Sequence, residues 1–132
     1  MKKLLASTLL SLTLGFCFAQ TQSAVNQTEY RNFQAADREL NSVYQKILRE
    51  YASDPAFLKN LRTAQRIWVQ FRDAEVKMKY PDRPAGHYGS VQPTCQSAYQ
   101  TALTEQRTAA LKIWLTGIGE GDVCAGSVRT KR

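Results

Sequence analysis

The sequence predicts an all-α protein: an antiparallel three-helix bundle with one long loop between helices two and three and a glycine-rich C-terminal tail. Three observations favour this class. Apolar residues recur in steps of three and four, proline and glycine gather between these stretches, and no segment alternates as a β-strand does. A chain of 132 residues is expected to form one domain.

The first 19 residues have the pattern of a secretory signal peptide. Lys2 and Lys3 precede an uncharged run that ends at Ala19. This run is too short and too rich in Ser and Thr for a membrane-spanning helix, which needs about 20 apolar residues. We therefore expect cleavage after Ala19 and a periplasmic or secreted protein without a transmembrane anchor. A retained anchor and a lipoprotein modified at Cys17 are the alternatives, and Phe16 before that cysteine disfavours the lipoprotein.

The charge pattern does not favour a nucleic-acid partner. The chain carries 18 Lys and Arg against 11 Asp and Glu, a net charge of +7. Loss of residues 1–19 removes two lysines and lowers the net charge to +5, of which the C-terminal Arg129, Lys131 and Arg132 supply three. We expect a nearly neutral folded domain at 20–128, a basic tail at 129–132 and no nucleic-acid binding.

The mature chain keeps two cysteines, Cys95 and Cys124, and an even pair in an oxidising compartment favours a disulfide. A helix unbroken from Cys95 to Thr116 would be about 31 Å long. The bond therefore requires the helix to end near Ile113 and the tail to fold back along the bundle. Free thiols or a bond between molecules are the alternatives. No His or Cys has the spacing of metal ligands, and no cofactor is expected.

The first helix is expected over residues 29–52. Asp54 and Pro55 follow it and start the next helix, because Asp is a good N-cap and proline is tolerated at the first helical position. The connecting turn is short, so the two helices should run antiparallel. The apolar face of the first helix is expected to comprise Phe33, Ala36, Leu40, Val43, Tyr44, Ile47, Leu48 and Tyr51.

The second helix is expected over Pro55–Lys79, and residues 80–93 form the long loop because they hold three of the four prolines. Ser90 is expected to cap the third helix, which glycines from Gly117 onward should end. The predicted apolar stripe of the second helix is Phe57, Leu61, Ala64, Trp68, Phe71 and Met78. That of the third is Ala98, Ala102, Ala109, Ala110 and Ile113, with Leu103 and Trp114 flanking it.

Each helix also carries polar residues on or beside its apolar stripe. Buried polar groups need hydrogen-bond partners, so we interpret these residues as a structural network in which Asp37 pairs with Arg72 or Arg107. Asn41 and Gln65 are expected to bridge helices. The full set is Asp37, Asn41, Tyr44, Gln65, Trp68, Arg72, Asp73, Thr104 and Arg107.

An enzyme is not expected. Asp37, Asp73 and Glu75 could form a glycosidase-like pair of carboxylates, but the arginines that crowd the same helices favour salt bridges instead. His87 is the single histidine, and no Ser or Cys has an assignable base partner.

Four strings, AADRELNSVY, LRTAQRIWVQFRDAE, YGS and LTEQRTAALKIW, carry a family resemblance. Over roughly residues 25–116 the chain resembles the LprI-like lysozyme-inhibitor domain of bacterial exported proteins. The resemblance implies a helical, non-catalytic binding protein that protects the envelope by inhibiting lysozyme. Val76 stands where the family usually has cysteine, and the family's usual N-terminal cysteine is absent too, so its usual cross-link is not expected.

A lysozyme inhibitor must fill a saccharide-binding cleft, and the long loop is the best candidate for this contact. Its expected contact residues are Arg83, His87, Tyr88 and Ser90. The partner would be lysozyme or another envelope or host protein. The alternative is an envelope protein without lysozyme inhibition that binds an anionic ligand or partner through a basic face: Lys59, Arg66, Lys77, Lys79 and the tail.

Overall fold

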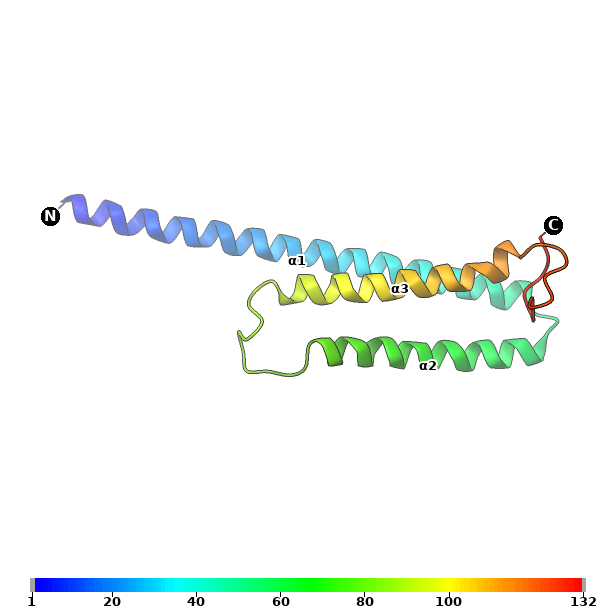
Figure 1. The fold of residues 1–132 in the computed structure, drawn as a ribbon. Helices are drawn as coiled ribbons and strands as arrows, with labels where there is room; N and C mark the ends of the chain where they lie inside the picture. Colours follow the sequence, from blue (N-terminus) through cyan, green and yellow to red (C-terminus); the bar gives the residue numbers. More distant parts are fainter. Residues whose placement is uncertain (1, 132) are drawn as a thin grey trace.

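The computed structural model describes the backbone of residues 2–131 and the side chains of residues 21–131. It contains three helices, α1 (Lys2–Glu50), α2 (Pro55–Lys79) and α3 (Gln92–Thr116). α1 and α3 run in the same direction, and α2 runs antiparallel to both (Figure 1). The expected all-α class with three helices is confirmed.

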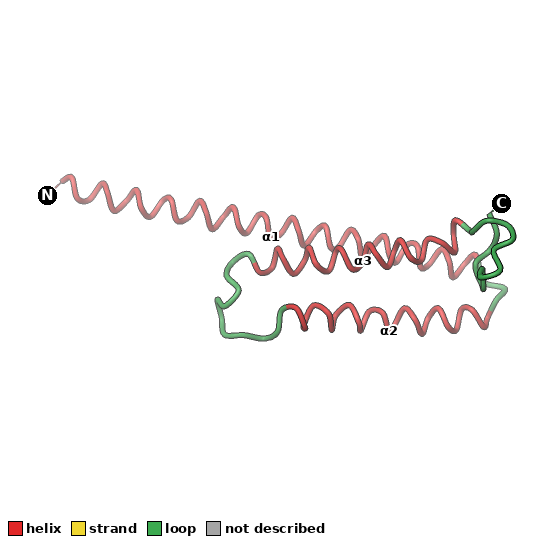
Figure 2. The backbone as a smooth tube through the Cα atoms, in the orientation of Figure 1, coloured by secondary structure: helices red, strands yellow, loops and turns green. Residues whose placement is uncertain are grey.

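The rest of the described chain consists of turns, loops and one isolated bridge between Ile118 and Thr130 (Figure 2). The long loop occupies residues 80–91, at one end of the bundle. The C-terminal tail folds over the opposite end, where α1 meets α2.

Helix α1 starts at Lys2, far before residue 29, at which the apolar periodicity begins and at which the helix was predicted to start. Its first turns project beyond the ends of the other two helices (Figure 1). Contact with α3 is present at Gln22 and Asn26, which form hydrogen bonds of 3.4 and 2.5 Å with Thr94 Oγ1. The expected signal peptide falls on the projecting part, and its side chains lie outside the described residues. Among the residues that the structure describes, no helix is both long and apolar enough to cross a membrane.

Helix α2 has the bounds that the sequence predicts. The Asp54 carboxylate accepts a hydrogen bond of 2.9 Å from the backbone N–H of Phe57, and Pro55 occupies the first helical position. Asp54 thus provides an acceptor for one of the free backbone N–H groups at the start of the helix, and Pro55 has no N–H that would need one, as expected from the sequence. The helix ends just before Pro81, whose ring cannot continue it.

The closest packing in the bundle is between α1 and α3. The buried face of α3 is small and polar: Ser97, Thr104 and Thr108 precede Leu111. Thr104 is fully buried, and its hydroxyl donates to the Gln100 carbonyl over 2.7 Å. Because such hydroxyls bond within their own helix, they can be buried without an unpaired group, and their small size lets the two backbones approach. The apolar core consists of Leu40, Val43, Ile47, Tyr51, Leu58, Leu61 and Leu111.

The apolar face predicted for α3 is wrong. Ala98, Ala102, Ala109 and Ala110 are exposed, and Ile113 is 39% exposed. The buried Ser and Thr residues repeat in the same steps of three and four, but on a neighbouring strip of the helix. Alanine ranks as more apolar than threonine, so the pattern alone selects the wrong strip.

The stripe predicted for α2 is also partly wrong. Phe71 and Met78 are 51% and 68% exposed, whereas Arg72 is buried. The buried face of α2 runs through Leu58, Leu61, Gln65, Arg72 and Val76. Arg72, one of the polar residues expected on or beside the stripe, therefore occupies a core position, and Phe71 next to it does not.

The two ends of α3 differ in how well the sequence predicted them. Ser90 does not cap the helix: Val91 is the N-cap residue and provides no side-chain hydrogen bond, while the Ser90 carbonyl accepts from the Asn26 side chain over 3.2 Å. At the other end, Gly117 ends the helix as expected, with φ of 72°. A Cβ at Gly117 would lie 2.8 Å from the Arg129 carbonyl oxygen, so this position requires glycine.

The C-terminal residues are tied to the end of the bundle. The Arg129 guanidinium donates to the Glu50 carbonyl over 2.6 Å and lies over the Tyr51 ring, with 4.1 Å from its carbon to the ring centre. The backbone N–H of Lys131 donates to the Ile118 carbonyl over 2.8 Å. The segment expected to be a basic tail is thus hydrogen-bonded to the domain as far as Lys131; Arg132 lies outside the described residues.

Candidate functional site

The buried side chain of Arg72 joins α1 to α2. Its Nη1 donates to Asp37 Oδ1 over 3.0 Å, and its Nε donates to Asp73 Oδ1 over 3.1 Å. The guanidinium also lies 5.4 Å from the ring centres of both Phe33 and Trp68. Of the two arginines weighed as partners for Asp37, the structure places Arg72 there.

A second arginine, Arg107, lies on the α3 side of Trp68. Its Nε donates to Gln65 Oε1 over 3.0 Å, so Gln65 bridges α2 and α3. Its guanidinium carbon lies 5.9 Å from the centre of the Trp68 ring. Desolvation by partial burial lowers the pKa of Arg107 below its ordinary value. Trp68 thus contacts two guanidinium groups.

The other expected network residues have local roles. Asn41 does not bridge helices: its amide donates to Asp37 Oδ2 over 3.2 Å within α1. Thr104 bonds within α3, and Tyr44 is half-buried against the apolar core. Of the nine expected residues, two are these arginines, five others lie around them, and Thr104 and Tyr44 belong to the packing between helices.

The carboxylates weighed as an acid–base pair are all engaged in structural contacts. Asp37 accepts hydrogen bonds at both of its oxygens, and Asp73 shares Arg72 with it. Glu75 accepts a hydrogen bond of 3.1 Å from the Tyr99 hydroxyl. That bond, as the largest cause, raises the pKa of Tyr99 above its ordinary value of 10.0.

The loop expected to contact a partner is held in shape by its own residues. The Tyr88 hydroxyl donates to the Pro81 carbonyl over 2.9 Å, and the Tyr88 ring packs edge-on against Tyr80, with 5.9 Å between ring centres. Backbone hydrogen bonds of 3.0 to 3.3 Å close successive turns from Pro84 to Gln92.

Three of the four expected loop contacts, Arg83, His87 and Ser90, are exposed. The His87 ring packs edge-on against Tyr88, with 4.7 Å between ring centres. Tyr88 itself is half-buried, and Ser90 uses its carbonyl to accept from Asn26. Tyr88 thus braces the loop, while the side chains of Arg83, His87 and Ser90 are accessible on it.

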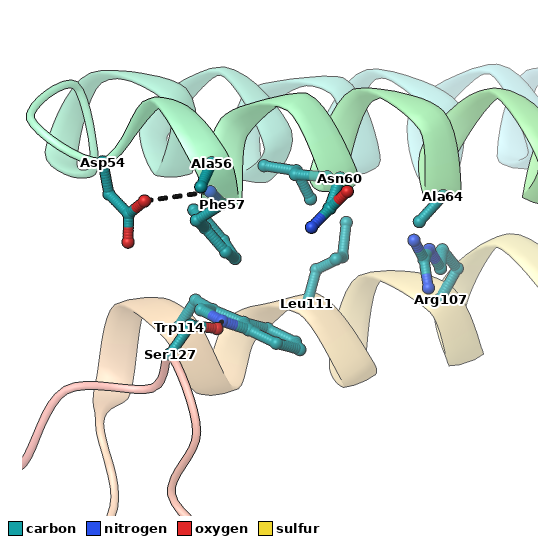
Figure 3. A pocket seen from close by; sticks show the side chains of 10 residues that line it. Asp54, Ala56, Phe57, Asn60, Ala64, Arg107, Leu111, Trp114 and Ser127 are labelled. Carbon is teal, nitrogen blue, oxygen red and sulfur yellow. Dashed lines mark hydrogen bonds between the residues drawn. The ribbon is translucent and has the colours of Figure 1, made fainter.

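A groove of about 470 Å³ lies between the first half of α2 and the second half of α3, at the opposite end of the bundle from the loop. Figure 3 shows Phe57 and Trp114 at one end of it and Arg107 pointing in from α3 at the other. Asn60 and Ser127, which the sequence analysis did not single out, also line it. The full lining is Asp54, Ala56, Phe57, Asn60, Leu61, Ala64, Arg107, Leu111, Trp114 and Ser127.

The C-terminal tail fixes the position of Trp114. The indole Nε1 donates to Ser127 Oγ over 3.0 Å, and the Trp114 carbonyl accepts from the Tyr51 hydroxyl over 3.1 Å. The Phe57 and Trp114 rings are stacked with 6.1 Å between their centres. The groove therefore has a rigid aromatic end. In the sequence, the groove is indicated only by two aromatic residues, Phe57 and Trp114, near helix ends that face each other. The width of the gap between the two helices cannot be predicted from the sequence pattern.

The expected disulfide between Cys95 and Cys124 is not formed, and both thiols are free and exposed. Helix α3 continues to Thr116 instead of ending near Ile113, and the tail stays at that end of the bundle (Figure 1). Cys95 lies in the first turn of the same helix. The length of the helix therefore separates the two cysteines.

The described residues of the basic face considered as an alternative site are all exposed, but two of them have other contacts. Lys59, Arg66 and Lys77 are exposed on α2. Lys79, however, lies over the Tyr99 ring, with 3.8 Å from its Nζ to the ring centre, and Arg129 is bonded to the end of α1.

The structure is that of a small helical domain with a buried polar centre, a braced loop and an open groove. The chain belongs to the lysozyme inhibitor LprI family, which it matches over residues 17–111, and this confirms the resemblance seen in the sequence. An uncharacterised protein of Rhizobium meliloti (strain 1021) is 30% identical over 105 residues, which cover 71% of this chain and 73% of that protein. No solved structure matches the chain.

Proposed function

We propose that the protein is exported and acts as a non-catalytic inhibitor of lysozyme that protects the bacterial envelope. Membership of the lysozyme inhibitor LprI family is the observation that carries this proposal. The pattern of residues 1–19 supports export. Cleavage after Ala19 would leave the described hydrogen bonds of Gln22 and Asn26 to α3 in place.

The loop at residues 80–91 is the proposed contact surface. It is braced by Tyr88, so little conformational entropy is lost when it binds. Arg83 and His87 are exposed on it and offer a cation and ring N–H groups. Lysozyme cleaves glycans with a pair of carboxylates in its cleft, and these are suitable partners for such groups.

The test is a titration of lysozyme activity with the protein from Gln20 onward. We expect activity to fall to near zero at about one equivalent, and Arg83→Ala with His87→Ala to weaken inhibition. Arg62→Ala is the matched control, because Arg62 is an exposed arginine in the half of α2 away from the loop. A flat activity curve contradicts the proposal, and equal weakening by the control contradicts the role of the loop.

Binding of an anionic ligand or partner through the basic face is the alternative function. Exposed Lys59, Arg66 and Lys77 support it. It requires binding to anionic vesicles or envelope fractions that weakens as salt rises, because screening shortens the reach of surface charges to about 8 Å at physiological ionic strength. Binding that does not change with salt argues against it.

A further inference from the structure

The groove between α2 and α3 combines an apolar interior with one cationic group. Phe57, Leu61, Leu111 and Trp114 are apolar residues of its lining, and Arg107 points into it from α3 (Figure 3). Its volume of about 470 Å³ is in the range of small-molecule sites, which are mainly apolar with a few polar groups that orient the ligand.

The charge of Arg107 has no counter-ion in the described part of the chain. The ion pairs there involve Lys46, Arg72 and Lys112, and Arg107 is not among them. Within residues 21–131, its described side-chain partner is neutral: Nε donates to the Gln65 side chain. The two terminal nitrogens are left to bind an anion, and a half-buried guanidinium favours a carboxylate that it can hold with two hydrogen bonds.

The geometry points to a small amphiphilic carboxylate as the ligand of this groove: its apolar body would lie against Phe57 and Trp114, and its carboxylate would pair with Arg107. Arg107 and Trp114 are seven residues apart on α3, about 10 Å along the helix axis, which suits a medium-chain acid. Asp54 at the far end disfavours a second negative charge there. The groove and the loop lie at opposite ends of the bundle, so this inference does not depend on lysozyme inhibition.

Octanoate is the probe, with octanol and octylamine as matched compounds that lack the carboxylate. Binding is measured by calorimetry and by the tryptophan emission, since Trp114 lines the groove. We expect saturable one-to-one binding of octanoate, with octanol about tenfold weaker and octylamine weaker still, because the pair with Arg107 contributes a charge-assisted hydrogen bond.

Two variants separate the cation from the apolar groove. Arg107→Gln should lower the affinity for octanoate about tenfold and leave that for octanol unchanged. Ala64→Met should weaken both, because Ala64 lines the groove and is exposed on α2, so the longer side chain fills the space without disturbing the core. Arg62→Gln is the charge-matched control and should have no effect.

Equal affinity for octanoate and octanol would overturn the inference, as would octanoate binding that is unchanged in both Arg107→Gln and Ala64→Met. If Arg107→Gln does not fold, the comparison of octanoate with octanol and the Ala64→Met variant still decide the question. Binding that occurs only where octanoate forms micelles also counts against the proposal.

Discussion

Replacement of Arg72 with alanine should destabilise the protein by about 2–3 kcal/mol. The two ion pairs involve carboxylates that are 40% and 53% exposed, so each contributes about 0.5–1 kcal/mol and not the larger value of a fully buried pair. Contact of the guanidinium with the Phe33 and Trp68 rings adds about 0.5 kcal/mol for each ring. The carboxylates left behind can be hydrated, which limits the loss.

The assay is urea unfolding followed by helical circular dichroism. A double-mutant cycle of Arg72→Ala with Asp37→Ala isolates the bond across α1 and α2, and a coupling free energy of about 1 kcal/mol is expected. Arg66→Ala, on the exposed face of α2, is the control and should change stability by less than about 0.5 kcal/mol. A loss below about 1 kcal/mol for Arg72→Ala, or no coupling in the cycle, would refute the assignment of Arg72 as the centre of the network.

Three further predictions follow from the backbone, the tyrosines and the cysteines. Gly117→Ala should destabilise the protein by about 1–3 kcal/mol in the same urea assay, because the positive φ of Gly117 and the nearby Arg129 carbonyl exclude a Cβ. Gly119→Ala is the control and should have little effect, because the space around Gly119 is open. The hydrogen bond from Tyr99 to Glu75 should stabilise the protein fully below pH 10.0 and be lost as the pH rises through the raised pKa of Tyr99. The melting temperatures of the wild type and Tyr99→Phe should therefore converge at high pH, and a difference that stays constant with pH would contradict this. Reductant should leave the melting temperature unchanged, because Cys95 and Cys124 are free, and a lowered one would show a stabilising disulfide.

The boundaries of α2 could be predicted because single residues set them. Asp54 and Pro55 fix its start by capping chemistry, and Pro81 prevents its continuation. The start of α1 could not be predicted in this way, because its helix continues through the stretch whose composition indicates a signal peptide. A composition typical of export says little about backbone conformation.

The faces of the helices were harder to predict than their ends. On α3 the sequence offers two strips, one of alanines and one of Ser and Thr, with the same spacing. The threonines of the second strip can be buried because the Thr104 and Thr108 hydroxyls each donate to a carbonyl of their own helix. On α2, Arg72 is buried because it contacts Asp37 and Phe33 of α1. The apolar pattern of α2 by itself contains no information on these contacts, and it predicted that Phe71 would be buried.

Of the two candidate sites, the Arg72 network could be predicted from the sequence and the groove could not. Polar residues in step with apolar ones indicated the Arg72 network, because a buried charge needs a partner wherever the partner lies. The groove depends on the distance between α2 and α3, which no local pattern encodes. The sequence predicted Arg107 as a residue of the polar network. Only the structure shows that its side chain also points into the groove.

Titration of lysozyme with the protein from Gln20 onward tests the central claim most directly. We expect loss of activity at about one equivalent, with weaker inhibition when Arg83 and His87 are replaced by alanine and full inhibition when Arg62 is replaced. Lysozyme activity that stays constant across an excess of the folded protein would contradict it.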